Sequence, residues 1–396
     1  MGIRYAFHIK HLLFHNLGGE EFMKKRFLGV LLSVAMVAAV LAGCGSSGAK
    51  ETAAPAGSET EAASETEAAS EAASGETEAA GNTGDVITVG FSQVGAESDW
   101  RTANSESMKS TFSTENGYNL IFDDAQQKQE NQIAAIRNFI QQEVDYIVLA
   151  PVTESGWDTV LQEAKDAEIP VIIVDRMVNV SDDSLYTAWV GSNFKLEGQK
   201  ACEWLKQYAA AKNMSEVNIV DIQGTIGASA QIGRTEALNE AVEANGWNLL
   251  AQQTGEFTQA KGQEVMESML KQYDNINVVY CENDNEAFGA IEAIKAAGKT
   301  VGPDGDILVM SFDTTKQGIT DTLSGDIIVN TECNPLHGPR VEQIIKQLQA
   351  GETPEKQAYV EEGIYAHGSD VASVTVDGTD YEVTEVTQDV VDARAY

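Results

Sequence analysis

Cysteine, histidine and basic residues are scarce in this 396-residue chain. The sequence has 4 cysteines and 5 histidines, and 61 Asp and Glu residues outnumber 26 Lys and Arg residues, for a formal net charge of -35 at pH 7. This excess of negative charge disfavours nucleic acid and anionic lipid surfaces as partners. Four cysteines are too few for a disulfide scaffold. Apart from Cys44, the chain has Cys202, Cys281 and Cys333, so at most one bridge can form, and the sequence leaves open whether Cys281 and Cys333 meet.

The shortage of histidine also weighs against an enzyme. After the amino-terminal region only His337 and His367 remain, and neither has a recognisable nucleophile beside it. Cys281 is better explained as a small apolar residue that ends a strand than as a nucleophile. The glycine-rich stretch from Gly224 to Gly233 lacks the Lys-Ser/Thr pair of a phosphate-binding loop, and no Asp-x-Asp-x-Asp calcium loop is present. We therefore expect no catalytic residue, no cofactor and no metal ion.

One long apolar run stands near the amino terminus, from Phe27 to Ala42, directly after Lys24-Lys25-Arg26. It is shorter than the roughly 20 residues that a membrane-spanning helix needs. The run ends in Leu41-Ala42-Gly43-Cys44, which has the form of a lipoprotein cleavage box. We predict that residues 1–43 are a signal peptide and that Cys44 is lipidated, which would anchor the protein outside the cell on the membrane; the alternative is a buried cysteine in an uncleaved helix.

Two further expectations concern the amino-terminal region. Gly18–Glu21 would spell a purine-rich ribosome-binding stretch if read as codons, so a start at Met23 would leave residues 1–22 untranslated. Residues 44–85 comprise the lipidated cysteine and a stretch of Ala, Ser, Glu, Thr and Gly with a near repeat of Ser-Glu-Thr-Glu-Ala-Ala. Such a composition cannot bury enough apolar area to offset its ordering entropy, so we predict a disordered acidic tether, with partial helix as the alternative.

The remaining chain alternates short β-branched runs with helical stripes such as Ile133, Ile136 and Ile140. This alternation predicts an α/β protein with two doubly wound parallel-sheet lobes. We expect strands at Val86–Phe91, Tyr118–Phe122, Tyr146–Leu149 and Val171–Val174 in the first lobe, and at Val217–Ile222, Trp247–Ala251, Asn277–Tyr280, Ile307–Met310 and Ile327–Asn330 in the second, with a hairpin near Asp377-Gly378.

Polar residues follow most of these predicted strands, at the sheet edge where ligands of open parallel sheets bind. Asn and Asp at such positions also cap helices, so one such residue alone is weak support for a site. Asp175-Arg176 is stronger, because a charged pair directly after an apolar strand is costly if buried without a partner. A guanidinium beside a carboxylate is suited to binding adjacent hydroxyl groups.

Four longer motifs make the resemblance to a family specific. They are Gly90–Arg101 (GFSQVGAESDWR), Gln126–Gln132 (QQKQENQ), Gly227-Ala228-Ser229 with Arg234, and Lys261–Ser268 (KGQEVMES). From about Val86 to Glu361 the sequence resembles the ribose/galactose-type periplasmic binding proteins of sugar ABC importers, and within them the members that bind galactofuranose. The resemblance implies a type I periplasmic binding protein fold, with residues 86–191 and 335–362 in the amino-terminal lobe and residues 192–334 and 363–396 in the carboxyl-terminal lobe.

The resemblance also implies a set of sugar contacts. Trp100 and Phe257 would form aromatic walls, although Phe257 could instead be a core side chain before a Thr258 cap. The other implied contacts are Glu97, Arg101, Asp175, Arg176, Arg234, Asn283, Asp313 and Glu332. At the last crossover the chain reads Thr331-Glu332-Cys333-Asn334-Pro335, which departs from the ribose-binding pattern. Glu332, Cys333 or Asn334 could face the sugar there, which weakens ribose as the ligand.

The implied function is that of a monomeric, extracytoplasmic receptor that captures a monosaccharide and delivers it to an ABC importer permease. Hinge closure would be centred near Gly191-Ser192, Asp313-Thr314 and Asn334-Pro335. Alternatives are a sugar sensor that docks on a chemoreceptor or signalling kinase, and a secreted enzyme. A sugar-responsive transcriptional regulator is disfavoured, because the predicted cleavage box and tether stand where its helix-turn-helix would be.

Overall fold

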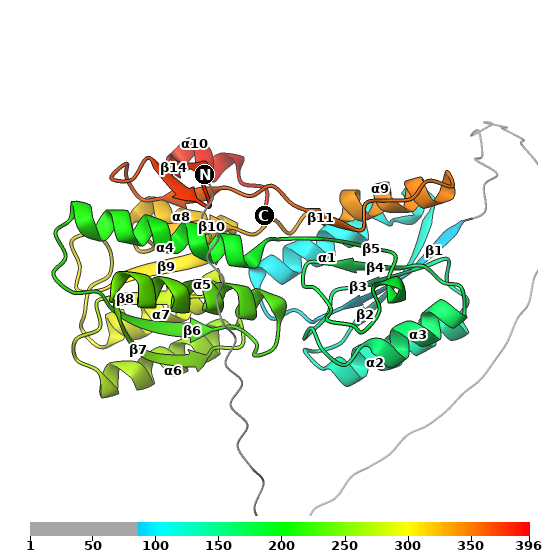
Figure 1. The fold of residues 1–396 in the computed structure, drawn as a ribbon, viewed down its shortest axis with the longest axis horizontal. Helices are drawn as coiled ribbons and strands as arrows, with labels where there is room; N and C mark the ends of the chain where they lie inside the picture. The colour runs from blue at the N-terminus through cyan, green and yellow to red at the C-terminus, as the bar shows by residue number, and fades with distance from the viewer. Residues whose placement is uncertain (1–85) are drawn as a thin grey trace, which may run out of the picture. The chain divides into compact units, whose positions relative to one another are not determined.

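The computed structural model describes residues 86–396. The predicted signal peptide, the lipidated Cys44 and the acidic tether all lie outside the described residues. The described chain contains two mainly parallel sheets, each enclosed by helices (Figure 1). The predicted α/β fold with two doubly wound lobes is confirmed.

The amino-terminal lobe is built on a six-stranded sheet in the order β11-β5-β4-β3-β1-β2, in which all neighbouring strands are parallel. Its strands are β1 (Ile87–Gln93), β2 (Tyr118–Asp124), β3 (Tyr146–Leu149), β4 (Val171–Val174), β5 (Ala188–Gly191) and β11 (Gln357–Tyr359). The helices of this lobe are α1 (Asp99–Thr111), α2 (Gln129–Gln141), α3 (Asp158–Asp166) and α9 (Gly338–Gln349), with short 3-10 helices at Thr114–Asn116 and Asp183–Leu185.

The carboxyl-terminal lobe is built on an eight-stranded sheet in the order β13-β14-β12-β10-β9-β8-β6-β7. Its strands are β6 (Asn218–Gln223), β7 (Asn248–Thr254), β8 (Val278–Cys281), β9 (Leu308–Asp313), β10 (Val329–Glu332), β12 (Ile364–Ala366), β13 (Ser373–Val376) and β14 (Thr379–Glu385). Its helices are α4 (Phe194–Ala211), α5 (Ser229–Asn245), α6 (Gln259–Gln272), α7 (Asp284–Ala296), α8 (Lys316–Ser324) and α10 (Gln388–Ala393). The pairs β10–β12 and β13–β14 are antiparallel.

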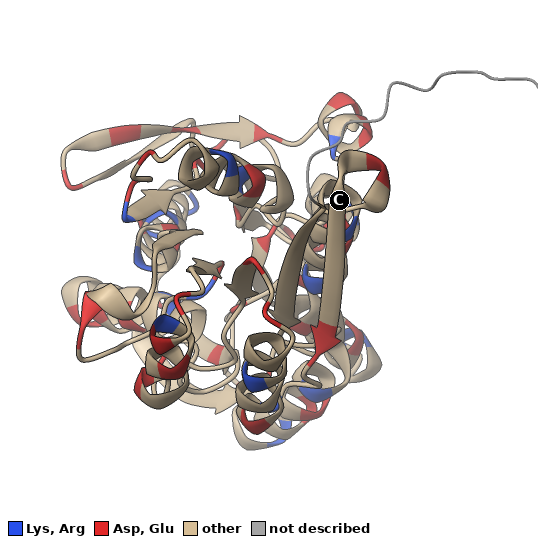
Figure 2. Cartoon of the chain, turned by 90° about the vertical axis from the view of Figure 1, so that its right-hand side faces the viewer, with Lys and Arg blue, Asp and Glu red and all other residues tan. Residues whose placement is uncertain are grey.

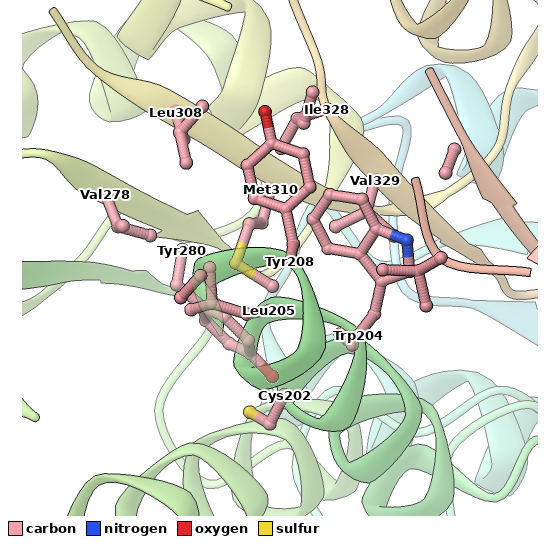
Figure 3. Close-up of a cluster of buried hydrophobic side chains, with 14 of the residues drawn as sticks. Cys202, Trp204, Leu205, Tyr208, Val278, Tyr280, Leu308, Met310, Ile328 and Val329 are labelled. Atoms are coloured by element: carbon pink, nitrogen blue, oxygen red, sulfur yellow. The ribbon is translucent and has the colours of Figure 1, made fainter. Parts of the chain in front are cut away.

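Packing of α4 against the second sheet illustrates how the sequence pattern builds a core. Trp204, Leu205 and Tyr208 lie on one face of α4 and contact the sheet side chains Tyr280 and Met310 (Figure 3). The rings of Trp204 and Tyr208 stack with centroids 4.7 Å apart. Burying each such side chain contributes about 1.5–3 kcal/mol, so this stripe fixes the helix on the sheet.

Three segments connect the two sheets. They are residues 192–193 between β5 and α4, residues 333–337 between β10 and α9, and residues 360–363 between β11 and β12. The predicted hinge at Asp313-Thr314 is wrong, because β9 and α8 on either side of it belong to the same lobe. The lobe boundary predicted between residues 362 and 363 lies within the third segment, although no hinge was predicted there; the preceding strand β11 is only three residues long.

The predicted strands are all present, with ends shifted by up to three residues, and the hairpin at Asp377-Gly378 is confirmed by the antiparallel pair β13–β14. The short strand β5 was not predicted, because Ala188-Trp189-Val190-Gly191 offers only four residues and one β-branched side chain. Within residues 86–396 the three cysteines are free and buried, so no disulfide joins Cys281 and Cys333.

Charged residues are spread over the helices and loops of the described chain, with Asp and Glu interspersed by Lys and Arg (Figure 2). None of the helices within residues 86–396 combines the length and apolar character required to cross a bilayer.

Candidate functional site

A small cavity lies between the two lobes. Thirteen residues line it, drawn from both lobes and from the second crossing segment: Glu97, Ser98, Trp100, Arg101, Asp175, Arg176, Phe194, Ala230, Arg234, Phe257, Asn283, Asp313 and Cys333. Nine of the ten residues predicted from the sequence are therefore brought together around one space.

Direct hydrogen bonds join the lobes around this cavity. The Glu154 N–H donates to the Gly227 carbonyl (2.9 Å), and the Met177 N–H donates to Ser229 Oγ (2.9 Å). On another side the Asp99 N–H donates to Asn285 Oδ1 (3.0 Å). The structure thus represents a closed arrangement in which the lining side chains are almost entirely buried.

The amino-terminal wall carries a buried network of opposite charges. The Ser98 side chain caps α1 by accepting a hydrogen bond from the Arg101 N–H, which sets Arg101 in the first turn of the helix. Arg101 Nε donates to Glu97 Oε1 (2.9 Å) and Arg101 Nη2 donates to Asp175 Oδ2 (2.8 Å). Glu97 Oε2 has no hydrogen-bond partner among the described residues, so one acceptor at the cavity wall remains available.

Arg176 extends this network toward the other lobe. Its Nη1 donates to the Val152 carbonyl (3.0 Å), and its Nη2 lies 3.7 Å from Glu97 Oε1. Its guanidinium stands 5.0 Å from the ring centroid of Phe257, across the cavity. Burial, together with the like charge of Arg101, lowers the pKa of Arg176 to about 10, so it remains a cation at neutral pH.

Arg234 is the cation of the carboxyl-terminal wall. Its Nε donates to Glu197 Oε2 (2.8 Å), its Nη2 lies 2.7 Å from the same oxygen, and Nη2 also lies 3.6 Å from Asp313 Oδ1. Burial raises the pKa of both Glu197 and Asp313 above their usual range, and the charge of Arg234 opposes this shift. One guanidinium therefore serves two buried carboxyl groups.

Burial would raise the pKa of Asp175, but the neighbouring cations Arg101 and Arg176 outweigh this effect and lower the pKa below its usual value. Asp175 is therefore an ionised acceptor, whereas Asp313 is a carboxyl group that resists ionisation. The amino-terminal lobe therefore presents an ionised carboxylate acceptor to the cavity, and the carboxyl-terminal lobe presents a carboxyl group that favours its neutral form.

Three lining residues adopt left-handed backbone conformations that favour glycine: Asp175 (φ 62°), Phe257 (φ 61°) and Asp313 (φ 100°). Such conformations cost on the order of 1–3 kcal/mol each and persist where the surrounding structure enforces them, commonly at functional sites. Their occurrence at three lining positions supports a site shaped for a ligand.

Aromatic side chains form the apolar part of the lining. Trp100 Nε1 donates to the Cys333 carbonyl (2.6 Å), which fixes the indole against the second crossing segment. Phe257 packs over Gly224, where an added Cβ would lie 1.9 Å from the ring carbon Cζ. Phe257 is therefore both a packed side chain and a cavity wall, and the two interpretations left open by the sequence are compatible.

Asn283 lines the cavity while acting as the cap of α7. Its Oδ1 accepts from the Glu286 N–H (2.9 Å) and its Nδ2 donates to the Phe257 carbonyl (3.1 Å). The helix-cap explanation therefore holds, and only the second amide hydrogen and second lone pair are left for a ligand.

The position predicted for Glu332 is wrong. Its carboxylate turns away from the cavity and binds Arg394 Nη1 (2.7 Å), the Tyr396 hydroxyl (2.7 Å) and the Gly363 N–H (2.9 Å). Because side chains alternate along a strand, Glu332 at the end of β10 faces the carboxyl-terminal segment. Cys333, the second of the three candidates in this segment, lines the cavity instead.

Sequence reasoning missed several residues that shape the site. Phe194 lines the cavity at the start of α4, just after the first crossing segment. Glu197 orients Arg234. Phe194 and Glu197 are one helical turn apart, which would place both side chains on one face of a helix. The same spacing is equally typical of an ordinary helix start, so it did not indicate a binding site.

A group of possible metal ligands lies beside the cavity. One ligand atom each from Glu197, Cys333 and Glu362 lie within 4.8 Å of one another. These groups already have protein partners, since Glu197 pairs with Arg234 and Glu362 Oε1 accepts from Ser192 Oγ (2.6 Å). The contacts are therefore explained without an ion.

A two-lobed parallel α/β protein with a polar cavity between its lobes is the architecture of a periplasmic binding protein. The family described as "Periplasmic binding protein domain" matches residues 89–331. The chain therefore belongs to the periplasmic binding protein family.

Among characterised proteins, the galactofuranose-binding protein YtfQ of Escherichia coli is 42% identical over 284 residues, which cover 70% of this chain and 87% of that protein. A solved structure from Mycobacterium smegmatis in complex with β-D-fucofuranose has a TM-score of 0.68 and 43% identity, with coverage of 71% of this chain and 91% of that one. The binding protein of the arabinose ABC transporter from Shewanella sp. ANA-3, bound to α- and β-L-arabinofuranose, has a TM-score of 0.66 and 42% identity, with coverage of 71% and 92%.

Proposed function

We propose that this protein captures a monosaccharide in its furanose form outside the cell and delivers it to an ABC importer, without converting it chemically. Galactofuranose or a closely related furanose is the proposed ligand. The residues proposed to contact it are Glu97, Trp100, Arg101, Asp175, Arg176, Arg234, Phe257, Asn283 and Asp313.

The observation that carries this proposal is the pairing of charged groups around a small cavity between aromatic walls. Arg101 and Arg176 face Glu97 and Asp175, so neither sign dominates the amino-terminal wall. A neutral ligand rich in hydroxyl groups can donate to the carboxylates and accept from the guanidinium groups. The indole of Trp100 and the ring of Phe257 suit the apolar C–H face of a sugar.

The related proteins support the furanose form. The relatives named above bind galactofuranose, fucofuranose and arabinofuranose according to their descriptions, and each is more than 40% identical to this chain. A single set of side chains that accommodates five-membered rings with different exocyclic groups would explain this range. We therefore propose that the ring is recognised by the wall residues, and that the exocyclic group is recognised less strictly.

The first test is calorimetry of the purified protein with galactose, as an equilibrating source of galactofuranose, and with D-fucose, L-arabinose and ribose. We expect tight binding of a furanose-forming sugar, and recovery of that sugar unchanged after incubation. Arg176→Ala should abolish measurable binding, because a buried guanidinium that pairs with hydroxyls and carboxylates typically contributes 2–5 kcal/mol.

Arg137→Ala is the matched control. Arg137 is an exposed arginine on α2 that pairs with Glu163 at 2.7 Å, so its loss should leave the sugar affinity unchanged. Failure of every sugar to bind, or consumption of the sugar, would reject the proposal.

Membrane attachment through Cys44 is a separate proposal that rests on the sequence alone. Cys44→Ala should release the protein from the membrane fraction and prevent acylation, as measured by mass spectrometry of the amino-terminal peptide. Retention of the variant in the membrane would contradict lipid anchoring. A gene deletion distinguishes transport from sensing: a transporter component is required for sugar uptake, whereas a sensor is required only for the signalling response.

A further inference from the structure

The turn after β8 and the first turn of α7 together carry three carboxyl groups that do not line the cavity. Glu282, Asp284 and Glu286 are each 0% exposed, and none of them lines the cavity. A carboxyl group is costly to bury unless it makes specific hydrogen bonds. Three of them within five residues therefore call for a structural explanation.

Glu282 holds the loop that follows β6. Its Oε2 accepts from the Gly224 N–H (2.8 Å), and its Oε1 accepts from Thr235 Oγ1 on α5 (2.5 Å). Its backbone carbonyl also accepts from Arg234 Nη1 (2.5 Å). This residue thus fixes the floor beneath Phe257 and one branch of the guanidinium in the cavity wall.

Glu286 holds the loop that follows β7. Its Oε1 accepts from the Phe257 N–H (2.8 Å), at the residue whose backbone is left-handed (φ 61°). An added Cβ at Gly255, two residues earlier, would lie 2.7 Å from the same Oε1. The carboxyl group therefore fits closely into this loop and supplies the acceptor that its strained backbone needs.

Asp284 holds the loop that follows β9. Its oxygens accept from Ser311 Oγ (2.7 Å), from the N–H and hydroxyl of Thr315 (2.8 and 2.7 Å) and from Asn330 Nδ2 (2.7 Å). Asn330 Oδ1 in turn accepts from the Thr314 N–H (3.1 Å). These bonds surround Asp313, the second lining residue in this lobe with a left-handed backbone (φ 100°).

We propose that Glu282, Asp284 and Glu286 are positioning residues that hold in place Arg234 on α5, Asp313 at the end of β9 and Phe257 in the loop after β7, and so preorganise the carboxyl-terminal half of the site before a ligand enters. This inference rests on the proposed sugar-binding function. Loops that are already ordered lose less entropy on binding, so preorganisation raises affinity without any contact between the turn and the ligand.

The protonation state of Glu286 makes the proposal testable with a conservative variant. Burial raises the pKa of Glu286 well above its usual range, which favours the neutral acid over the carboxylate. Glutamine has nearly the same shape and keeps a carbonyl acceptor for the Phe257 N–H. Glu286→Gln should therefore preserve the function of this residue, and Glu286→Ala should remove it.

The experiment compares these two variants of the full-length protein by calorimetry with galactose, or with the tightest-binding sugar of the first test. We expect the dissociation constant to rise about tenfold or more for Glu286→Ala, as expected for the loss of a buried hydrogen bond, and to stay within about threefold for Glu286→Gln. Should the alanine variant fail to fold, Glu286→Leu replaces it, because leucine fills the space without accepting a hydrogen bond.

Asp221→Ala is the matched control for general loss of stability. Asp221 is also fully buried, on β6 of the same lobe, but its side chain bonds only to Gln252 (3.0 Å) and does not line the cavity. It should lower the melting temperature without changing the affinity. Unchanged affinity in Glu286→Ala, or an equal loss in Asp221→Ala, would overturn the positioning role.

Hydrogen exchange separates this inference from the proposed function. The amide protons of Phe257 and Gly224 should be protected in the wild-type protein without any ligand. They should exchange faster in Glu286→Ala and Glu282→Ala, respectively. If no sugar binds the wild-type protein, the proposed function fails, and the exchange rates still decide whether the turn orders these loops. Unchanged exchange rates would count against the inference.

Discussion

The two lobes build their halves of the site with different chemistry. In the amino-terminal lobe, neutral amides fasten the loops: Gln132 Nε2 donates to the Ala150 carbonyl (2.7 Å) and its Oε1 accepts from the Val152 N–H (2.9 Å). In the carboxyl-terminal lobe, the loops are held instead by the buried carboxyl groups of Glu282, Asp284 and Glu286. Amides do not titrate, whereas carboxyl groups do, so the contacts that hold the loops should respond to pH only in the second lobe.

The charge balance also differs between the lobes. Glu97 and Asp175 share two guanidinium groups, those of Arg101 and Arg176. Glu197 and Asp313 share only that of Arg234. If one guanidinium group is lost, the carboxylates of the amino-terminal wall still have a second cation. The carboxyl groups of the carboxyl-terminal wall have only Arg234. Four predictions test this difference.

The largest effect is expected from removing Arg234. Arg234→Ala leaves Glu197 and Asp313 buried without their guanidinium partner, which should cost about 3–5 kcal/mol of unfolding free energy. Arg176→Ala should cost only about 1–2 kcal/mol, because Arg101 still bonds to both carboxylates of its wall. Urea unfolding of both variants measures the difference. Equal losses would show that the two walls do not differ in this way.

The second prediction concerns pH. Burial raises the pKa of Asp221 to about 7 from 3.8, so the folded protein binds this proton more tightly than the unfolded chain. The resulting stabilisation is present below pH ~4 and is lost as the pH rises to ~7, by at most about 4 kcal/mol. Asp221→Asn should therefore gain stability relative to wild type as the pH rises through this window.

Asp175→Asn is the contrasting variant in the other lobe. Cations lower the pKa of Asp175 despite its burial, so its contribution is present above the unfolded pKa and is lost as the pH falls. The stability difference between this variant and wild type should shrink in acid, which is the opposite trend. Thermal unfolding at pH 4, 6 and 8 measures both trends. If the stability difference from wild type changed in the same direction with pH for both variants, the opposite pKa shifts of Asp221 and Asp175 would be refuted.

The sequence predicted most of the fold because its apolar runs are short, β-branched and regularly separated. The resemblance to the family implied nine of the lining residues, and for Asp175 and Arg176 their position directly after a predicted strand was an independent indication. These signals are local in the chain. They require no knowledge of how side chains from different elements meet.

The errors arose where contacts between residues far apart in the sequence determine the direction of a side chain or the path of the chain. Glu332 and Cys333 are adjacent in the sequence, and only the partners Arg394 and Tyr396, more than sixty residues later, turn Glu332 away from the cavity. A hinge was predicted at Asp313-Thr314 and none at the third crossing, residues 360–363, which follows a strand of only three residues. Buried carboxyl groups such as Glu286 look like ordinary surface residues until the loops they fasten are known.

The third prediction compares glycines that follow the first strand of each lobe. An added Cβ at Gly224 would lie 1.9 Å from Phe257 Cζ, whereas at Gly95 its nearest neighbours would be 3.3 Å away. Gly224→Ala must displace the aromatic wall, which should cost about 1–3 kcal/mol of sugar-binding free energy. Gly95→Ala should have a smaller effect. Calorimetry measures the sugar affinity of both variants. A larger loss of affinity for Gly95→Ala than for Gly224→Ala would contradict the close packing of Phe257 on Gly224.

The smallest effect is expected at the junction between the lobes. Ser192 Oγ on the first crossing segment donates to Glu362 Oε1 on the third (2.6 Å), and the same oxygen accepts from the Asn334 N–H on the second (2.7 Å). Ser192→Ala removes one bond of a link that joins all three segments, which should cost about 1 kcal/mol of unfolding free energy. Ser110→Ala is the control, because Ser110 Oγ bonds within α1 to the Ser107 carbonyl. If both variants unfold at the same urea concentration, the junction contributes no more than a local helix contact, and the difference between the lobes is maintained by their own cores alone.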